Sequence, residues 1–170
     1  MRLQVHNWLQ AVQGWILPPT CIRCGCAGRT PLLDLCEFCE AELPKNAAAC
    51  RLCGMPFAVE AEGPCRSCAR RSWHFDSVLA PYLYDYPVDR LVQRFKYEGR
   101  LEVGRVLATL LGHAVQRSGA ARPEVLLPVP LARSKLRSRG FNQAVELAWP
   151  IAKALSLPMR RDLCVRVRAT

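Results

Sequence analysis

The chain has 170 residues, of which 51% are hydrophobic, and it carries a formal net charge of +10 at pH 7. That length leaves room for one small domain plus roughly 100 further residues, and it excludes an array of large domains. No apolar stretch approaches the roughly 20 residues that cross a bilayer, so a membrane-spanning helix is excluded as well.

Residues 1–20 are expected to form an amphipathic helix and its exit turn. Apolar side chains recur at helical spacing from Met1 to Ile16, and Pro18 and Pro19 end the pattern. We expect this helix to dock on the segment that follows, and contact with a membrane surface is the alternative. The first residues carry no secretory signal, which predicts a cytoplasmic protein.

A tandem repeat of cysteines comes next. Each copy runs Cys-x2-Cys-x11-Cys-x2-Cys, and each cysteine of the second copy lies 29 positions after its counterpart. Two residues between thiols let both sulfurs of a turn reach one ion, and two such turns complete a tetrahedral zinc site. We therefore predict a double zinc ribbon over residues 21–70 with two Zn²⁺ ions. The predicted ligands are Cys21, Cys24, Cys36 and Cys39 for one ion, and Cys50, Cys53, Cys65 and Cys68 for the other.

Both metal sites should be structural, because four thiolates leave zinc no open position for water or substrate. A repeat of this length buries too little apolar surface to fold alone, so metal binding should supply most of its folding free energy. Disulfides are one alternative, which the missing secretory signal disfavours, and a thioredoxin-like redox motif is another. Ligand sets drawn from within each copy are favoured over a cross-braced arrangement.

Two further cysteines, and one histidine near the repeat, lie outside the two ligand sets. Cys26 has Met55 as its counterpart in the second copy, so we interpret it as a bystander. Cys164 lies in the apolar run 163–167 and is expected to be a small buried hydrophobic residue. His74 follows the last cysteine of the repeat, but both sets are already complete.

One strand and two helices are predicted over residues 75–116. The segment 75–84 is strand-like, and three alternating tyrosines form either a packed face or a stacking surface for bases if the strand continues. Pro87 then opens a helix that should stop at Gly99, and a second helix is expected over 101–116. The tyrosines are Tyr82, Tyr84 and Tyr86.

A strand, a basic loop, a helix and a second strand are predicted over residues 124–167. Residues 124–130 are a nearly all-apolar run of the kind buried in a parallel sheet, and 163–167 is the second predicted strand. The loop that follows the first strand would lie at its carboxyl end, where open α/β sheets bind ligands. Pro150 lies inside the predicted helix and should kink it or split it in two.

Positive charge is concentrated in this loop and near residue 170. Eight thiolates on two Zn²⁺ ions would add about −4 and leave roughly +6 overall. The local density of cations suits a polyanion, either nucleic acid or a pyrophosphate group, and a solvated basic face is the alternative. The cations are Arg133, Lys135, Arg137 and Arg139, followed by Arg160, Arg161, Arg166 and Arg168.

Four short motifs follow the cysteine repeat. They are Phe-Lys-Tyr-Glu-Gly-Arg at 95–100, Pro-Val-Pro-Leu at 128–131, Arg-Gly-Phe-Asn-Gln-Ala at 139–144 and Arg-Val-Arg-Ala-Thr at 166–170. In this order they resemble the ComF family of competence-associated, amidophosphoribosyltransferase-like bacterial proteins, over nearly the whole chain. The resemblance implies a double zinc ribbon followed, over 75–170, by an incomplete type I phosphoribosyltransferase-like α/β domain. It also implies a link to the uptake of external DNA.

By position, the resemblance makes segment 128–143 the loop that faces pyrophosphate in phosphoribosyltransferases. Arg139 is then expected to contact phosphate, with Gly140 allowing close approach of the backbone. Asn142 would donate hydrogen bonds, and an ordinary helix cap is its alternative role. The anion-binding candidates are Arg139, Gly140, Asn142, Gln143, Lys96 and Arg137.

The chain departs from the family pattern after its last motif. Family members carry paired aspartates and a Thr-Thr-Gly turn that would grip the ribose and 5′-phosphate of phosphoribosyl pyrophosphate, and this chain contains neither. We therefore expect a truncated member without transferase activity, and phosphoribosyl pyrophosphate as a ligand of the complete fold. The alternative is a non-enzymatic zinc-ribbon module that binds single-stranded DNA or a DNA-uptake protein through its basic loops.

Overall fold

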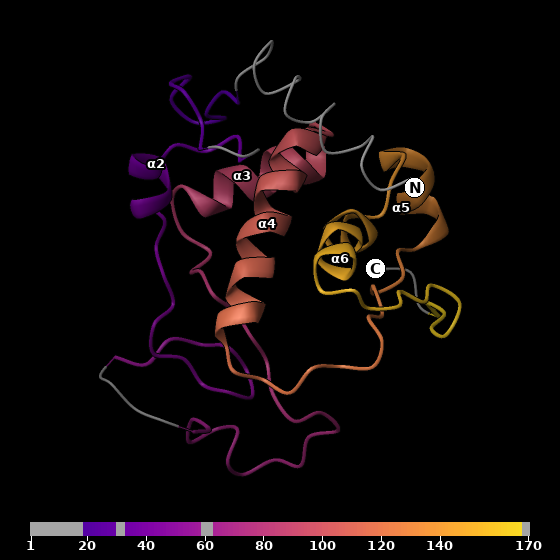
Figure 1. Ribbon diagram of the computed structural model, residues 1–170. Coiled ribbons are helices and arrows are strands. Elements are labelled where there is room, and N and C mark those ends of the chain that lie inside the picture. Colours follow the sequence, from indigo (N-terminus) through magenta and orange to yellow (C-terminus); the bar gives the residue numbers. More distant parts are fainter. Residues whose placement is uncertain (1–18, 30–32, 59–62, 168–170) are drawn as a thin grey trace, which may run out of the picture.

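The computed structural model describes residues 19–29, 33–58 and 63–167. Within these ranges the chain folds into helices joined by long turns, and its β-structure consists of isolated bridges. Figure 1 shows α4 in the centre, with α6 on one side, the first cysteine-rich segment and α2 on the other, and the second cysteine-rich segment below. The helices are α2 (Glu37–Ala41), α3 (Val88–Tyr97), α4 (Leu101–Arg117), α5 (Arg133–Arg139) and α6 (Gln143–Ala154). The helix expected over residues 1–16 lies outside the described residues.

Helix α3 follows from a proline start and an apolar stripe. Pro87 is its N-cap, and Gly99, with a φ of 67°, turns the chain out of the helix toward α4. Val88, Leu91 and Phe95 are buried at helical spacing. The predicted helix between Pro87 and Gly99 is therefore confirmed.

Helix α4 carries the centre of the core. Val103, Val106 and Leu110 are buried in the same cluster as the apolar stripe of α3. Gly104 lies against the ring of Phe95, and a Cβ at this position would come within 2.5 Å of the ring carbon Cε2. The helix predicted over 101–116 is confirmed. No helix of the described residues, α4 included, is both long and apolar enough to span a bilayer.

Helix α6 packs along α4 and continues through Pro150. Of the two effects expected of Pro150, a kink or a split, the split is wrong, because buried side chains anchor the helix on both sides of the proline: Ala148 before it, Ile151 and Ala152 after it. A proline in a helix interior removes a single backbone hydrogen bond, that of its own missing N–H. Packing against α4 keeps the two halves in register.

The segments before and after α6 pair in parallel through one residue of each, Leu126 and Met159. The Leu126 N–H donates to Pro158 O at 2.9 Å, and the Arg160 N–H donates to Leu126 O at 3.1 Å, on either side of the Leu126–Met159 bridge. The predicted strand 163–167 is wrong: it forms no bridge among the described residues, and Val165 is 82% exposed. The pairing lies four or more residues earlier, because the chain turns back directly after α6.

The strand predicted over residues 75–84 is reduced to a single contact. Only Tyr82 bridges, antiparallel to Lys45, and its ring is half-buried against the core. Tyr84 and Tyr86 are exposed, so the three rings do not share one packed face. Among the described residues the α/β class therefore rests on the Leu126 pairing, and the phosphoribosyltransferase-like scaffold stays a prediction.

The predicted basic loop is a helix. Helix α5 spans seven residues, buries none of them and ends at Gly140, whose φ of 82° is left-handed. A glycine at this position ends a helix without the steric cost that a Cβ would bring. The cations of this segment are therefore displayed on a short helix that precedes α6.

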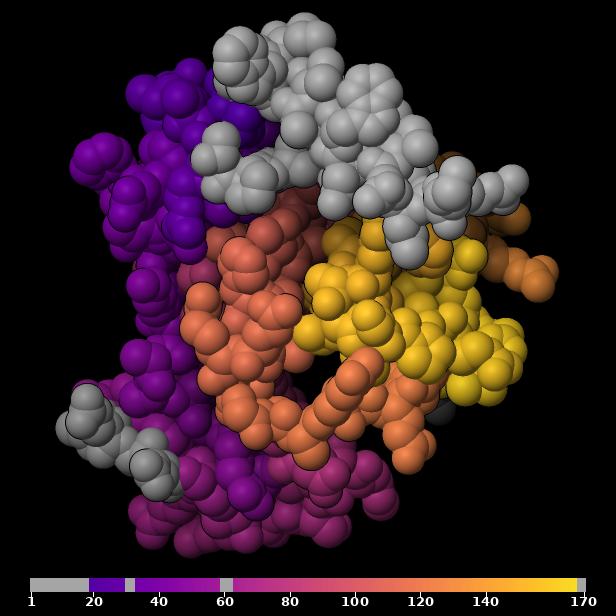
Figure 2. Space-filling model, viewed as in Figure 1, coloured from indigo at the N-terminus to yellow at the C-terminus, as the bar shows by residue number. Residues whose placement is uncertain are grey.

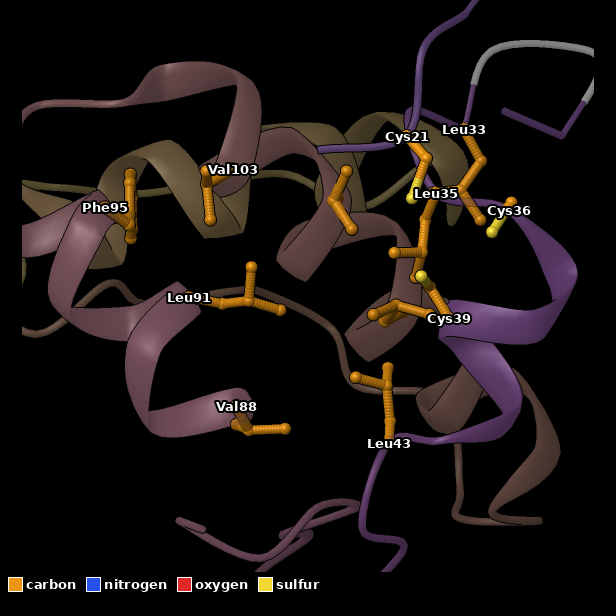
Figure 3. Packing of buried hydrophobic residues seen from close by; sticks show 12 residues of the cluster. Cys21, Leu33, Leu35, Cys36, Cys39, Leu43, Val88, Leu91, Phe95 and Val103 are labelled. Carbon is orange, nitrogen blue, oxygen red and sulfur yellow. The ribbon is translucent and has the colours of Figure 1, made fainter. Parts of the chain in front are cut away.

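A single apolar cluster joins the first ribbon to α3 and α4 (Figure 3). The ribbon contributes three of its cysteines together with three leucines, and the helices contribute their apolar stripes. The second ribbon lies away from α6 (Figure 2), and its cysteines are not part of this cluster. The ribbon residues of the cluster are Cys21, Leu33, Leu35, Cys36, Cys39 and Leu43.

Candidate metal centres and basic surface

Two groups of four thiols are already gathered for metal binding. In each group the four sulfurs lie within 4.8 Å of one another, and each group comes from a single copy of the repeat. The arrangement is sequential, as favoured over cross-bracing, and four thiolates at this spacing match the donor set of a closed tetrahedral zinc site. The groups, compatible with two structural zinc ions, are Cys21, Cys24, Cys36 and Cys39, and Cys50, Cys53, Cys65 and Cys68.

The backbone at the first knuckle of each copy has the same geometry. The Gly25 N–H donates to Cys21 O at 2.9 Å, and the Gly54 N–H donates to Cys50 O at 2.8 Å. Both glycines are left-handed, with φ of 76° and 70°. A residue without Cβ adopts this conformation with least strain, so each glycine lets the chain fold back and present two thiols to one ion.

Cys26 contributes its backbone to this knuckle. Its carbonyl accepts from the Cys21 N–H at 2.7 Å, and in the second copy the carbonyl of Met55 accepts from the Cys50 N–H at 2.9 Å. Any side chain serves at this position, which explains why the repeat works without a second thiol there. His74 and Cys164 lie outside both sulfur groups, and Cys164 is exposed, so its predicted burial is wrong.

The thiol pKa values differ in the same way within each group. For Cys21 and Cys50, burial raises the pKa, but hydrogen bonds from neighbouring backbone N–H groups outweigh it and lower the pKa to about 6. Burial raises the pKa of the last thiol, Cys39 or Cys68, to about 12. The first thiol of each group is therefore ionised at pH 7, whereas a metal must displace the proton of the last.

The start of α6 collects two of the anion-binding candidates. Asn142 is the N-cap: its Oδ1 accepts from the Ala144 N–H at 3.0 Å, and its Nδ2 donates to Val129 O at 3.1 Å. These bonds give Asn142 the role of a helix cap. Gln143 is only 8% exposed, and its Nε2 has no hydrogen-bond partner among the described residues.

Two further candidates, Arg139 and Lys96, lie near the end of α3. The guanidinium of Arg139 stacks over the ring of Tyr97 at 5.3 Å from the centroid, beside Lys96 in the sequence. The rings of Phe95 and Phe141 also meet, with centroids 5.5 Å apart. The structure thus brings together the motifs at 95–100 and 139–144, which the sequence leaves 39 positions apart.

A pocket of about 410 Å³ lies between α5, α6 and the segment 128–131. Of the candidates, Gly140 and Asn142 line it, while Arg139, Gln143, Arg137 and Lys96 do not. Its charged lining residues are Arg161 and Glu146. The sequence shows Arg161 as one of the basic residues near the end of the chain, and only the fold brings it to this pocket beside α6.

A cleft of about 790 Å³ lies between the first ribbon and α3. Four arginines line it, but each of them is close to a carboxylate: Arg23 pairs with Glu42 at 2.7 Å, and Arg29 pairs with Glu40 at 2.6 Å. Arg94 also donates to the carbonyl of Ile22 at 3.1 Å. The hydrogen bond from Arg94 therefore links α3 to the ribbon, whereas each ion pair lies within one of the two segments.

Comparison with known proteins finds a matching domain model and several relatives. A model described as double zinc ribbon domain matches residues 12–69. Competence protein F of Haemophilus influenzae is 29% identical over 154 residues, which are 88% of this chain and 66% of that protein. Competence protein ComFC of Bacillus subtilis is 31% identical over 134 residues, which are 75% of this chain and 55% of that protein.

A third relative carries a different name. The DNA utilization protein YhgH of Salmonella typhimurium is 29% identical over 140 residues, or 80% of this chain and 61% of that protein. The chain thus spans two thirds or less of the length of these relatives. No solved structure matches it significantly. These relatives confirm the resemblance to the ComF family, and the chain is a homologue of its competence proteins with a double zinc ribbon at the amino-terminal end.

Proposed function

We propose that this protein handles DNA during competence and that α5 contacts the DNA backbone. The names of the relatives refer to competence and to DNA utilization. The observation that carries the proposal is the state of the α5 cations. Arg133, Lys135 and Arg137 are exposed and take part in no ion pair of the described residues, whereas seven arginines elsewhere are paired.

The charge pattern of α5 suits a polyanion. The helix has no acidic residue in its first turn and two arginines in its last, and its sequence Arg-Ser-Lys-Leu-Arg-Ser-Arg contains no carboxylate. Cations that neutralise phosphates release condensed counterions, and this release drives sequence-independent binding. Non-specific contact with DNA is therefore the chemistry that α5 supports.

We further propose that residues 75–167 form part of a phosphoribosyltransferase-like scaffold without transferase activity. The parallel pairing of Leu126 with Met159 across α6 supports the scaffold. The chemistry beside α6 favours inactivity: Arg139 stacks on Tyr97, and the pocket holds Glu146 with a single arginine. Phosphoribosyl pyrophosphate, which carries several negative charges, would meet weak attraction there.

The experiment measures DNA affinity as a function of salt by fluorescence anisotropy, with a labelled single strand. Combining Lys135→Ala with Arg137→Ala should weaken binding and reduce the slope of log K against log salt by about 1.4, or about 0.7 for each lost contact. The control combines Arg70→Ala with Arg71→Ala, two exposed arginines of the second ribbon. The control should bind like the wild type.

Two results would reject α5 as the DNA contact. One is wild-type affinity that does not change with salt. The other is an equal loss of affinity in the α5 double variant and in the ribbon control, because the two variants remove the same charge.

A further inference from the structure

We propose that Tyr97 is a stacking platform for an unpaired base of single-stranded DNA whose phosphates lie along α5. The inference rests on the proposed DNA-binding function and adds to it a preference for single strands. It starts from an aromatic ring that the fold exposes beside the unpaired cations. Tyr97, the last residue of α3, is 75% exposed.

The ring is held in place by one of its neighbours. Arg139 places its guanidinium over Tyr97, and this cation–π contact leaves most of the ring in solvent. Arg139 is itself the last residue of α5, so the ring lies at the end of the basic helix. Arg139 thus connects the ring to the helix that carries the other cations.

The side chain of Tyr97 is not needed to hold α3 against the junction between α5 and α6. Phe95 already does this, because its ring is 1% exposed and meets Phe141 at a centroid distance of 5.5 Å. A tyrosine that served only as an anchor would be buried in the same way. An exposed ring on a rigid support is what stacking on a free base requires.

Tyr86, a second exposed tyrosine, differs from Tyr97 in the charge of its surroundings. Tyr86 also carries a guanidinium over its ring, that of Arg23 at 5.8 Å. Arg23, however, is neutralised by Glu42 at 2.7 Å. Arg139 has no ion pair among the described residues, and the other cations of α5 continue from it.

The dimensions fit a short stretch of one strand. A seven-residue helix is about 10 Å long, so its cations can contact only a short stretch of one strand. In a duplex the bases are stacked on one another, so a ring at the protein surface gains nothing from them. Tyr97 should therefore matter for single strands alone.

The test compares an oligothymidylate with a duplex of equal length, again by fluorescence anisotropy at several salt concentrations. Tyr97→Leu should weaken single-strand binding about tenfold, because stacking on one base contributes about 1–3 kcal/mol. Its salt slope and its duplex affinity should match the wild type, since no charge is removed. Tyr97→Phe should retain affinity, and so should the control Tyr84→Leu, which alters another exposed tyrosine.

The other outcomes of this test overturn either the stacking platform alone or DNA binding as well. Wild-type affinity of Tyr97→Leu for the single strand overturns the stacking platform and leaves DNA binding intact. An equal loss for the duplex, or an equal loss in Tyr97→Phe, also overturns it, because stacking explains neither. Absence of wild-type binding to both DNAs at low salt overturns the proposed function and this inference together.

Discussion

Gly104 shows how a single missing methyl group fixes the contact between α3 and α4. The Phe95 ring occupies the space that a side chain at this position would fill, and an added Cβ would meet three ring carbons at 2.5 to 3.0 Å. The ring cannot move aside easily, because it is one of the largest fully buried side chains. The close approach of the two helices depends on this glycine.

Gly104→Ala should therefore destabilise the protein although alanine favours helix. Overpacking a core costs about 1–3 kcal/mol, which exceeds the gain of about 1 kcal/mol in helix propensity. Thermal unfolding followed by circular dichroism should give a lower Tm. The matched control is Gly112→Ala, also in α4, where the nearest atom would be Ile151 Cγ1 at an ordinary 3.7 Å. The control should unfold at the wild-type temperature or higher, and equal Tm values for the two variants would contradict the account.

At the scale of elements, the two ribbons differ in whether they share the core of the helices. Three cysteines of the first ribbon belong to the cluster that contains Leu91 and Phe95, whereas no cysteine of the second does. Arg94 adds a hydrogen bond from α3 to the first ribbon, at Ile22 O. The first metal site thus shares its core with the helices, and the second site organises its own loops.

Loss of each site should have a different effect on the helices. Cys36→Ser should lower the Tm of the helical signal clearly, because the ligand it removes lies in the common core. Cys65→Ser, the equivalent change in the second copy, should release one zinc ion and leave the helical transition close to that of the wild type. Circular dichroism at 222 nm combined with zinc analysis measures both effects. Equal destabilisation by the two variants would contradict the difference between the ribbons.

The elements that sequence predicted well are those with local signals. Helices α3, α4 and α6 show apolar spacing and end signals within their own residues, such as Pro87 and Gly99. The strand predicted over 163–167 was wrong because pairing is set by distant partners: nothing in these residues reveals that Met159 pairs with Leu126 instead. Helix α5 was missed because it buries no residue and so shows no apolar stripe, although Gly140 at its end is a typical stop signal.

The candidate sites also divide into those with local sequence signals and those that only the fold brings together. The cysteine groups are encoded by spacing within each copy, so all eight were found from sequence. The surface around Tyr97 needed the fold, because Arg139 reaches it from another helix. For Asn142, sequence left two roles open, and hydrogen bonds to Ala144 and Val129 show the cap.

At the scale of the whole molecule, pH should control the metal content. The thiols must be ionised to bind zinc, and the lowered pKa of Cys21 and Cys50, about 6, marks where protons begin to compete for even the most acidic ligands. Metal-dependent stability is thus present above this pH and is lost as the pH falls through it. Zinc release, followed with a colorimetric chelator, should be small at pH 7.5 and should increase progressively below about pH 6. Full retention at strongly acidic pH, or release on raising the pH, would contradict this expectation.

Each ribbon should depend on its own metal, because each group of four sulfurs comes from one copy of the repeat, and the first group continues into the helical core. The most direct test is the zinc content of purified, reduced protein by elemental mass spectrometry, with Cys21→Ser and its neighbour Cys26→Ser as a matched pair. The account predicts two zinc ions per chain in the wild type and in Cys26→Ser, and one in Cys21→Ser. A wild-type protein that is folded without zinc, or a Cys26→Ser variant that loses as much metal as Cys21→Ser, would contradict it.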